Sequence, residues 1–147
     1  MPNTPLLAGE GMSVFETPSN LSEEETAFVQ SVFSALGRID HAPCKNMDAV
    51  TAVSGSGPAY VFMFIEALAD AGVKQGLDPV LATQLAAQTF IGAARLLKES
   101  GYTPSVLRQR VSSPGGTTSP WALSAIVGPC PEPKWRRTIR FSTLTMP

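Results

Sequence analysis

The segment VSSPGGTT at residues 111–118 has the residue types that best suit ligand binding in this chain. Two glycines after a proline allow the backbone to approach a ligand closely. If Thr117 and Thr118 open a helix, free backbone N–H groups converge there and attract an anion such as a carboxylate. An ordinary turn between two helices has the same composition. The residues alone therefore leave two interpretations open, a ligand-binding loop or a plain turn.

Other candidate sites are weaker. VSGSGPAY at 53–60 has Tyr60 in place of the third glycine and no clear strand before it, so it is not a dinucleotide fingerprint. We interpret it as a tight break that lets two helices cross closely. His41, the single histidine, lacks a partner at helical spacing, and we expect it on the surface. Glu66 and Asp70 are four residues apart, and we favour a capped or hydrogen-bonded structural role over a pair of catalytic acids.

The bulk composition is that of a globular protein. The 147 residues are 44% apolar and 16% charged, with a net charge of −1, which gives no general attraction to nucleic acid or to an anionic membrane. Cys44 and Cys130 fit neither a metal site nor a disulfide framework. The apolar run at 59–68 is shorter than the ~18 residues that span a bilayer. No secretory signal is apparent at the start. We expect a cytoplasmic protein that binds no metal, nucleic acid or membrane.

The first part of the chain alternates between strand and helix signals. We expect strand pieces within 6–16, ending near Phe15. Ser22 and Glu25 have capping-box spacing, and apolar residues follow at helical spacing, which predicts a helix from about 23 to 36 with Gly37 as its C-terminal cap. A short strand is expected at 38–42.

From residue 47 onward the sequence predicts helices only. We expect a short helix at 48–53 that stops at Gly55 and Gly57, then helices at about 58–74, 79–99 and 104–111. Each of the last three helices has a proline in its first turn, where the missing N–H does no harm: Pro58, Pro79 and Pro104. The helix from residue 59 is apolar on almost every face, so protein must surround it. A partner subunit is the natural cover.

Four segments together resemble pyrroline-5-carboxylate reductase. They are MPNTP at 1–5, DAVTAVSGSGPAYVF at 48–62, ALADAGVKQGL at 67–77 and VSSPGGTT at 111–118. The resemblance covers about residues 1–120. It implies a mainly α fold, a helical dimerisation domain of the 6-phosphogluconate-dehydrogenase-like type at 47–120, preceded at 1–46 by an α/β remnant of a Rossmann domain. The family's glycine-rich fingerprint would come before Met1, so we expect this chain alone to be inactive.

The same resemblance implies a function and a set of site residues. The family reduces 1-pyrroline-5-carboxylate to L-proline with NADPH or NADH and assembles as homo-oligomers through its helices. Ser113, Gly116 and Thr117 correspond to the residues that hold the substrate carboxylate. Thr118 corresponds to the catalytic hydroxyl beside the ring nitrogen. Arg110 corresponds to a position near the cofactor, where the family side chain varies.

The chain also departs from the family pattern. Cys44 and Gln109 stand where the family often has acidic residues. After residue 120 three prolines fall within five residues, which excludes one continuous helix. Residues 121–147 also contain four basic residues and a single acidic one, Glu132. We therefore interpret 121–147 as a divergent, disordered or frame-shifted tail. The alternative function is a non-catalytic helical dimerisation or interaction module. A related dehydrogenase family with a helical second domain is disfavoured by the long match around SGSGPAY.

Overall fold

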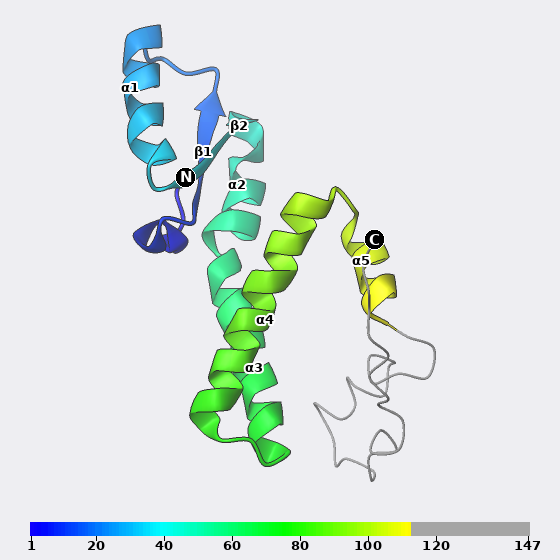
Figure 1. The fold of residues 1–147 in the computed structure, drawn as a ribbon. Helices are drawn as coiled ribbons and strands as arrows, with labels where there is room; N and C mark the ends of the chain where they lie inside the picture. The colour runs from blue at the N-terminus through cyan, green and yellow to red at the C-terminus, as the bar shows by residue number, and fades with distance from the viewer. Residues whose placement is uncertain (113–147) are drawn as a thin grey trace. The chain divides into compact units, whose positions relative to one another are not determined.

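A parallel pair of strands joined by a helix begins the structure, and helices make up the rest. The computed structural model describes residues 1–112 and divides the chain into two compact units, Met1–Phe64 and the part from Ile65 onward. Within the described residues the elements are η1 (Thr4–Ala8), β1 (Gly11–Thr17), α1 (Glu23–Ser34), β2 (Gly37–Pro43), η2 (Cys44–Asn46), α2 (Met47–Val50), η3 (Thr51–Gly55), α3 (Gly57–Lys74), α4 (Pro79–Ser100) and α5 (Pro104–Val111) (Figure 1). The mainly helical fold with a short α/β part agrees with the sequence prediction.

The two strands pair in parallel from Gly11 opposite Gly37 to Thr17 opposite Pro43. The two strands approach so closely at this first residue pair that a Cβ on Gly37 would overlap the carbonyl oxygen of Gly11. Gly37 also has a φ of +146°, which L side chains rarely adopt. A Cβ on Gly11 would lie 2.6 Å from the Cβ of Leu6. Glycine at these positions therefore permits the start of the sheet.

Helix α1 forms the expected capping box. The Glu25 N–H donates to Ser22 Oγ at 3.2 Å, and the Ser22 N–H donates to Glu25 Oε2 at 2.9 Å. The Glu25 carboxylate accepts from the Ser22 N–H and also from the Ser22 hydroxyl, at 2.8 Å, and these two bonds hold the pKa of Glu25 below its ordinary value. The helix ends before Gly37, which does not cap it: Ala35 is the cap, and Gly37 opens β2. The predicted role of Gly37 was wrong because the same backbone freedom serves the close contact with β1.

Two other predictions for this unit need correction. Leu6–Ala8 lies in the 3-10 turn η1 rather than in a strand, since Pro5 opens a turn that Gly9 closes with a left-handed φ of +73°. The glycines of SGSGP do not break the chain into two crossing helices. Cys44–Lys74 runs as one helical stretch of 31 residues, and the π-helical turn η3 carries it past Gly55, where the Ser56 N–H donates to the Thr51 carbonyl at 2.8 Å.

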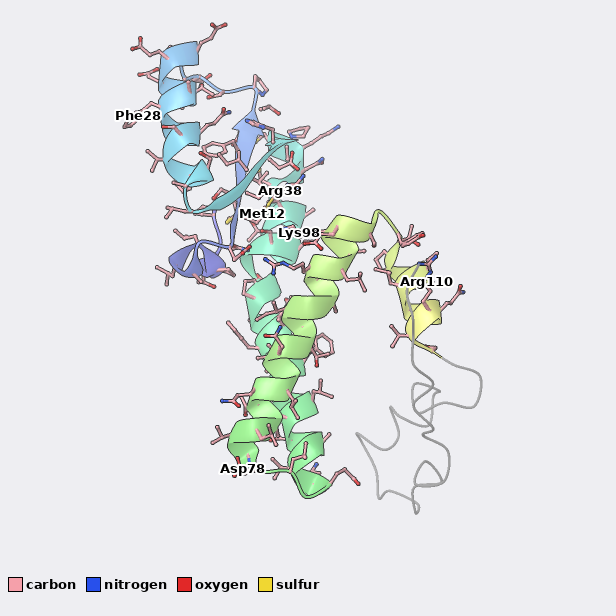
Figure 2. The ribbon with its side chains drawn as sticks, viewed as in Figure 1. Met12, Phe28, Arg38, Asp78, Lys98 and Arg110 are labelled. Carbon is pink, nitrogen blue, oxygen red and sulfur yellow. The ribbon has the colours of Figure 1, made fainter. Side chains whose placement is uncertain are left out.

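Helices α4 and α5 begin and end as the sequence predicts. Asp78 caps α4 through its Oδ1, which accepts the N–H groups of Val80 at 2.9 Å and Leu81 at 3.1 Å. Figure 2 shows Asp78 at the turn between α3 and α4. Gly101, with φ +67°, ends α4, and Pro104 occupies the first turn of α5. Local capping chemistry therefore determines these boundaries.

The second unit has a small core of alanines. Ala69 on α3 packs with Ala82 and Ala86 on α4, and small side chains let these helices run side by side (Figure 1). No large side chain in residues 1–112 is fully buried. On α3, Phe62 is 64% exposed and Phe64 is 61% exposed. The described part of the chain thus leaves much of its apolar surface uncovered.

The length and apolar composition of two helical stretches, Cys44–Lys74 and Pro79–Ser100, also satisfy a simple test for membrane-spanning helices. The test uses length and composition only, and core helices of soluble proteins pass it as well. Only 11% of each apolar window is buried in the part of the chain that the structure describes, which leaves these surfaces open to a partner.

Candidate functional site

Helix α5 leads directly into the proposed substrate loop. Ser112 closes this helix: its N–H donates to the Arg108 carbonyl at 3.0 Å, and its Oγ donates to the same carbonyl at 2.8 Å. The first serine of SSPGGTT is therefore engaged in ending a helix. The predicted binding residues Ser113, Gly116, Thr117 and Thr118 lie outside the described residues.

Arg110, the predicted cofactor contact, lies in the last turn of α5, where Figure 2 labels it. Its guanidinium carbon is 3.9 Å from the centre of the Tyr102 ring, a cation–π distance. Segment 101–112 contains Arg108 and Arg110 but no acidic residue. A cation near the end of a helix is favoured by the helix dipole. No ion pair within residues 1–112 involves Arg110, so a positive charge lies immediately before residue 113.

Sequence reasoning missed Tyr102, because no short-range pattern relates a residue in the turn before a helix to one in its last turn. Aromatic and arginine side chains eight residues apart were the only available signal.

Asn3 is a second residue that sequence reasoning missed, although it lies in the MPNTP segment. Its Oδ1 accepts the N–H of Met12 on β1 at 2.8 Å. Its Nδ2 donates to the Ser54 carbonyl in η3 at 3.1 Å, with a longer 3.4 Å contact to Ser54 Oγ. One amide side chain thus joins the first strand to the π-helical turn, within the unit that contains both segments.

A groove of about 440 Å³ lies beside this contact. Its lining includes Asn3, Ser54, Pro58 and the apolar side chains of Val61 and Phe62, and no charged residue. The groove can therefore hold an apolar group but has nothing to attract an anion.

The remaining candidates form no catalytic pair and no metal site within the described residues. His41 is exposed, as predicted, and its Nε2 accepts a hydrogen bond from the Gln30 amide nitrogen at 2.9 Å. Glu66 and Asp70 are exposed, and the predicted structural hydrogen bonds to their side chains are not present within residues 1–112. No cluster of three or more His, Cys, Asp or Glu residues that could bind a metal occurs in this range.

Cys44 follows the end of β2 and is exposed. A hydrogen bond with Glu16 and the negative charge of that carboxylate raise the pKa of the Cys44 thiol, with a smaller contribution from Asp48. A raised pKa lowers the thiolate fraction, so the site does not favour a nucleophilic cysteine.

Comparisons with known proteins agree on one family. The model of the pyrroline-5-carboxylate reductase dimerisation domain matches residues 45–124, which is more than half of the chain. Pyrroline-5-carboxylate reductase from Arabidopsis thaliana is 52% identical over 118 residues, which are 80% of this chain and 43% of the relative. The Synechocystis enzyme is 48% identical over 118 residues, 80% of this chain and 44% of its own length. The chain thus spans less than half of these relatives.

Solved structures give the same result. The pyrroline carboxylate reductase of Plasmodium falciparum, crystallised with NADP bound, superposes with a TM-score of 0.77 at 41% identity, over 84% of this chain and 51% of that one. The Streptococcus pyogenes reductase has a TM-score of 0.77 at 34% identity, over 84% and 48% of the two chains. With the family model covering α2 to α5 and the loop segment beyond, this chain belongs to the pyrroline-5-carboxylate reductase family.

Proposed function

We propose that the chain is part of a pyrroline-5-carboxylate reductase, which reduces 1-pyrroline-5-carboxylate to L-proline with NADPH or NADH. The family match over residues 45–124 carries this proposal, because it runs through α5 and includes the whole VSSPGGTT segment. The weakness of the acid–base candidates is compatible with it. The cofactor supplies the hydride, so the protein needs to hold and orient the substrate rather than to provide a nucleophile.

The substrate groups are assigned to the loop after α5. Ser113, Gly116 and Thr117 hold the ring carboxylate through a hydroxyl and backbone N–H groups, which suit an anion. The hydroxyl of Thr118 hydrogen-bonds the ring nitrogen. Arg110 contributes a positive charge near the cofactor.

The described residues fit the cofactor only in part. The cation at Arg110 fits an anionic group, since no carboxylate in segment 101–112 neutralises it. The connection from β1 to α1 does not fit a dinucleotide phosphate. Glu23, Glu24 and Glu25 occupy the first turn of α1, where they would repel a phosphate placed at that helix start.

The proposal includes assembly and domain organisation. The uncovered apolar side chains of α3 and α4 support a homo-oligomer formed through these helices. We retain the division into an α/β part at 1–46, a helical part at 47–120 and a tail at 121–147. We also retain a cytoplasmic location, where substrate and nicotinamide cofactor meet in solution.

The test uses a chimeric reductase, defined as the Arabidopsis enzyme with its matching 118-residue segment replaced by that of this chain. We expect substrate-dependent NADPH oxidation. Thr118→Ala removes the hydroxyl and keeps the backbone donors. A lost hydrogen bond to a charged group costs about 1.5–3 kcal/mol, so kcat/KM should fall by about ten- to a hundredfold.

Thr118→Ser is the matched control, since it keeps the hydroxyl and should keep most of the activity. A chimera without turnover would overturn the proposed function, whereas parental activity in Thr118→Ala would overturn the role of Thr118 alone. The 147-residue chain is assayed beside the chimera, and we expect no turnover from it.

The second candidate is a non-catalytic helical dimerisation module. The observation that favours it is the extent of exposed apolar surface on α3 and α4. This surface favours a partner whether or not the assembled protein catalyses a reaction. An inactive chimera that still dimerises would support this alternative.

A further inference from the structure

Tyr102 occupies the turn between α4 and α5. Gly101, with its left-handed φ of +67°, redirects the chain at the end of α4, and the Tyr102 N–H donates to Ser100 Oγ at 3.3 Å. Tyr102 is followed by Thr103 and by Pro104, whose ring fixes the backbone at the first turn of α5. The ring of Tyr102 therefore projects from a short segment held at both ends.

Arg110 reaches back to this ring along α5. Side chains on a helix lean toward its N-terminus, so a long side chain in the last turn extends toward the preceding turns. The guanidinium carbon lies 3.9 Å from the ring centre. At this distance the guanidinium lies over the aromatic ring, a cation–π contact that arginine forms more readily than lysine.

Stacking leaves the hydrogen-bond donors of Arg110 available. The N–H groups of a guanidinium lie in its plane, so a ring against its face does not block them. No acidic residue occurs between Gly101 and Ser112, and the one ion pair within residues 1–112 joins Arg95 and Glu99. Within residues 1–112 no carboxylate therefore pairs with Arg110, and its donors are available to an oxyanion.

We propose that Tyr102 is a positioning residue, which holds Arg110 in one orientation so that its guanidinium binds a phosphate of the nicotinamide cofactor. The inference rests on the proposed reductase function. An unrestrained arginine samples many rotamers and loses that freedom on binding, whereas a stacked arginine has lost part of it already. Tyr102 acts through Arg110 and does not itself touch the cofactor.

The experiment measures KM for NADPH, KM for the pyrroline substrate and kcat in the chimeric reductase. Tyr102→Leu removes the aromatic face and should raise KM for NADPH about two- to fivefold, the effect of one exposed cation–π contact. The substrate KM and kcat should change less. Tyr102→Phe keeps the ring and should match the parent. Tyr102 is 43% exposed, so neither change should prevent folding, which melting temperatures verify.

A double variant separates positioning from general structure. In an Arg110→Gln background, Tyr102→Leu should have no further effect on KM for NADPH, because the side chain that it positions is gone. An equal loss in both backgrounds would overturn the inference, and so would a parental KM for NADPH in Tyr102→Leu or a Phe variant as weak as the Leu variant. A rise confined to the substrate KM would also overturn it, since Arg110 would then bind the substrate carboxylate.

An inactive parent chimera refutes the proposed function and this inference with it; an active parent with unaffected variants refutes the inference alone.

Discussion

Asn3 makes the contact whose removal should be most informative for the first unit. Its side chain accepts from the Met12 N–H at 2.8 Å and donates to the Ser54 carbonyl at 3.1 Å. Asn3→Ala removes both bonds and leaves a donor and an acceptor unpaired at a partly buried site. Each neutral hydrogen bond is worth about 0.5–1.5 kcal/mol. We therefore expect Asn3→Ala to lower the free energy of unfolding by about 1–3 kcal/mol.

The assay is chemical unfolding of the chimeric reductase, combined with hydrogen exchange. Protein concentration must be equal for all variants because oligomer stability depends on it. Asn3→Asp separates the two bonds: the carboxylate still accepts from Met12 but repels the Ser54 carbonyl. The Met12 amide should stay protected in Asn3→Asp and exchange faster in Asn3→Ala.

Ser54→Ala is the matched control for this experiment. It removes only the Oγ, whose contact with Asn3 is 3.4 Å long, and leaves the carbonyl in place. We expect a change of less than about 0.5 kcal/mol, the range of ordinary surface substitutions. The reasoning would be refuted by an Asn3→Ala variant as stable as the parent, or by a Ser54→Ala variant that loses as much stability as Asn3→Ala.

Three further predictions follow from other parts of the structure. Gly37→Ala should destabilise the chimera by several kcal/mol in thermal unfolding, since its Cβ would overlap the Gly11 carbonyl oxygen; a change below about 0.5 kcal/mol would contradict this. In the 147-residue chain with Cys130→Ser, Cys44 should be alkylated more slowly than a free thiol at pH 8, because its raised pKa moves thiolate formation to higher pH. Glu16→Gln should accelerate this alkylation. Equal rates with and without Glu16 would disprove that cause. The 147-residue chain should sediment as a dimer or larger species at micromolar concentration, and a compact monomer would contradict the role assigned to its exposed apolar helices.

Local chemistry made much of the fold predictable. The Ser22–Glu25 capping box and the Asp78–Pro79 pair each determine a helix start through bonds within three residues, and both predictions were confirmed. Glycine was harder to interpret, because its backbone freedom serves several purposes. Gly37 was expected to end a helix and instead allows two strands to approach. Gly55 was expected to stop a helix and instead lies within a π-helical turn.

Contacts between distant residues were not predictable from one sequence. Asn3 and Ser54 are 51 positions apart, and neither residue type nor spacing indicates their hydrogen bond. Tyr102 and Arg110 are closer in sequence, but their contact depends on the left-handed turn at Gly101 and on the direction of an arginine side chain. The family resemblance identified the substrate loop residues, which stay predictions.

The π-helical turn at Thr51–Gly55 has a consequence for which changes the 44–74 helix can accept. Such a turn contains one residue more than an α-helical turn. One residue corresponds to about 100° of rotation about the helix axis, at 3.6 residues per turn. The side chains after Gly57 therefore have a different angular phase from those before Thr51 than an uninterrupted α-helix would give them. Deleting a single residue between Thr51 and Gly55 would restore α-helical hydrogen bonding, and because the wide turn already absorbs that residue, the side chains of residues 57–64 would keep their phase relative to α2. A change that makes this turn α-helical without removing a residue would instead rotate those side chains by about 100°.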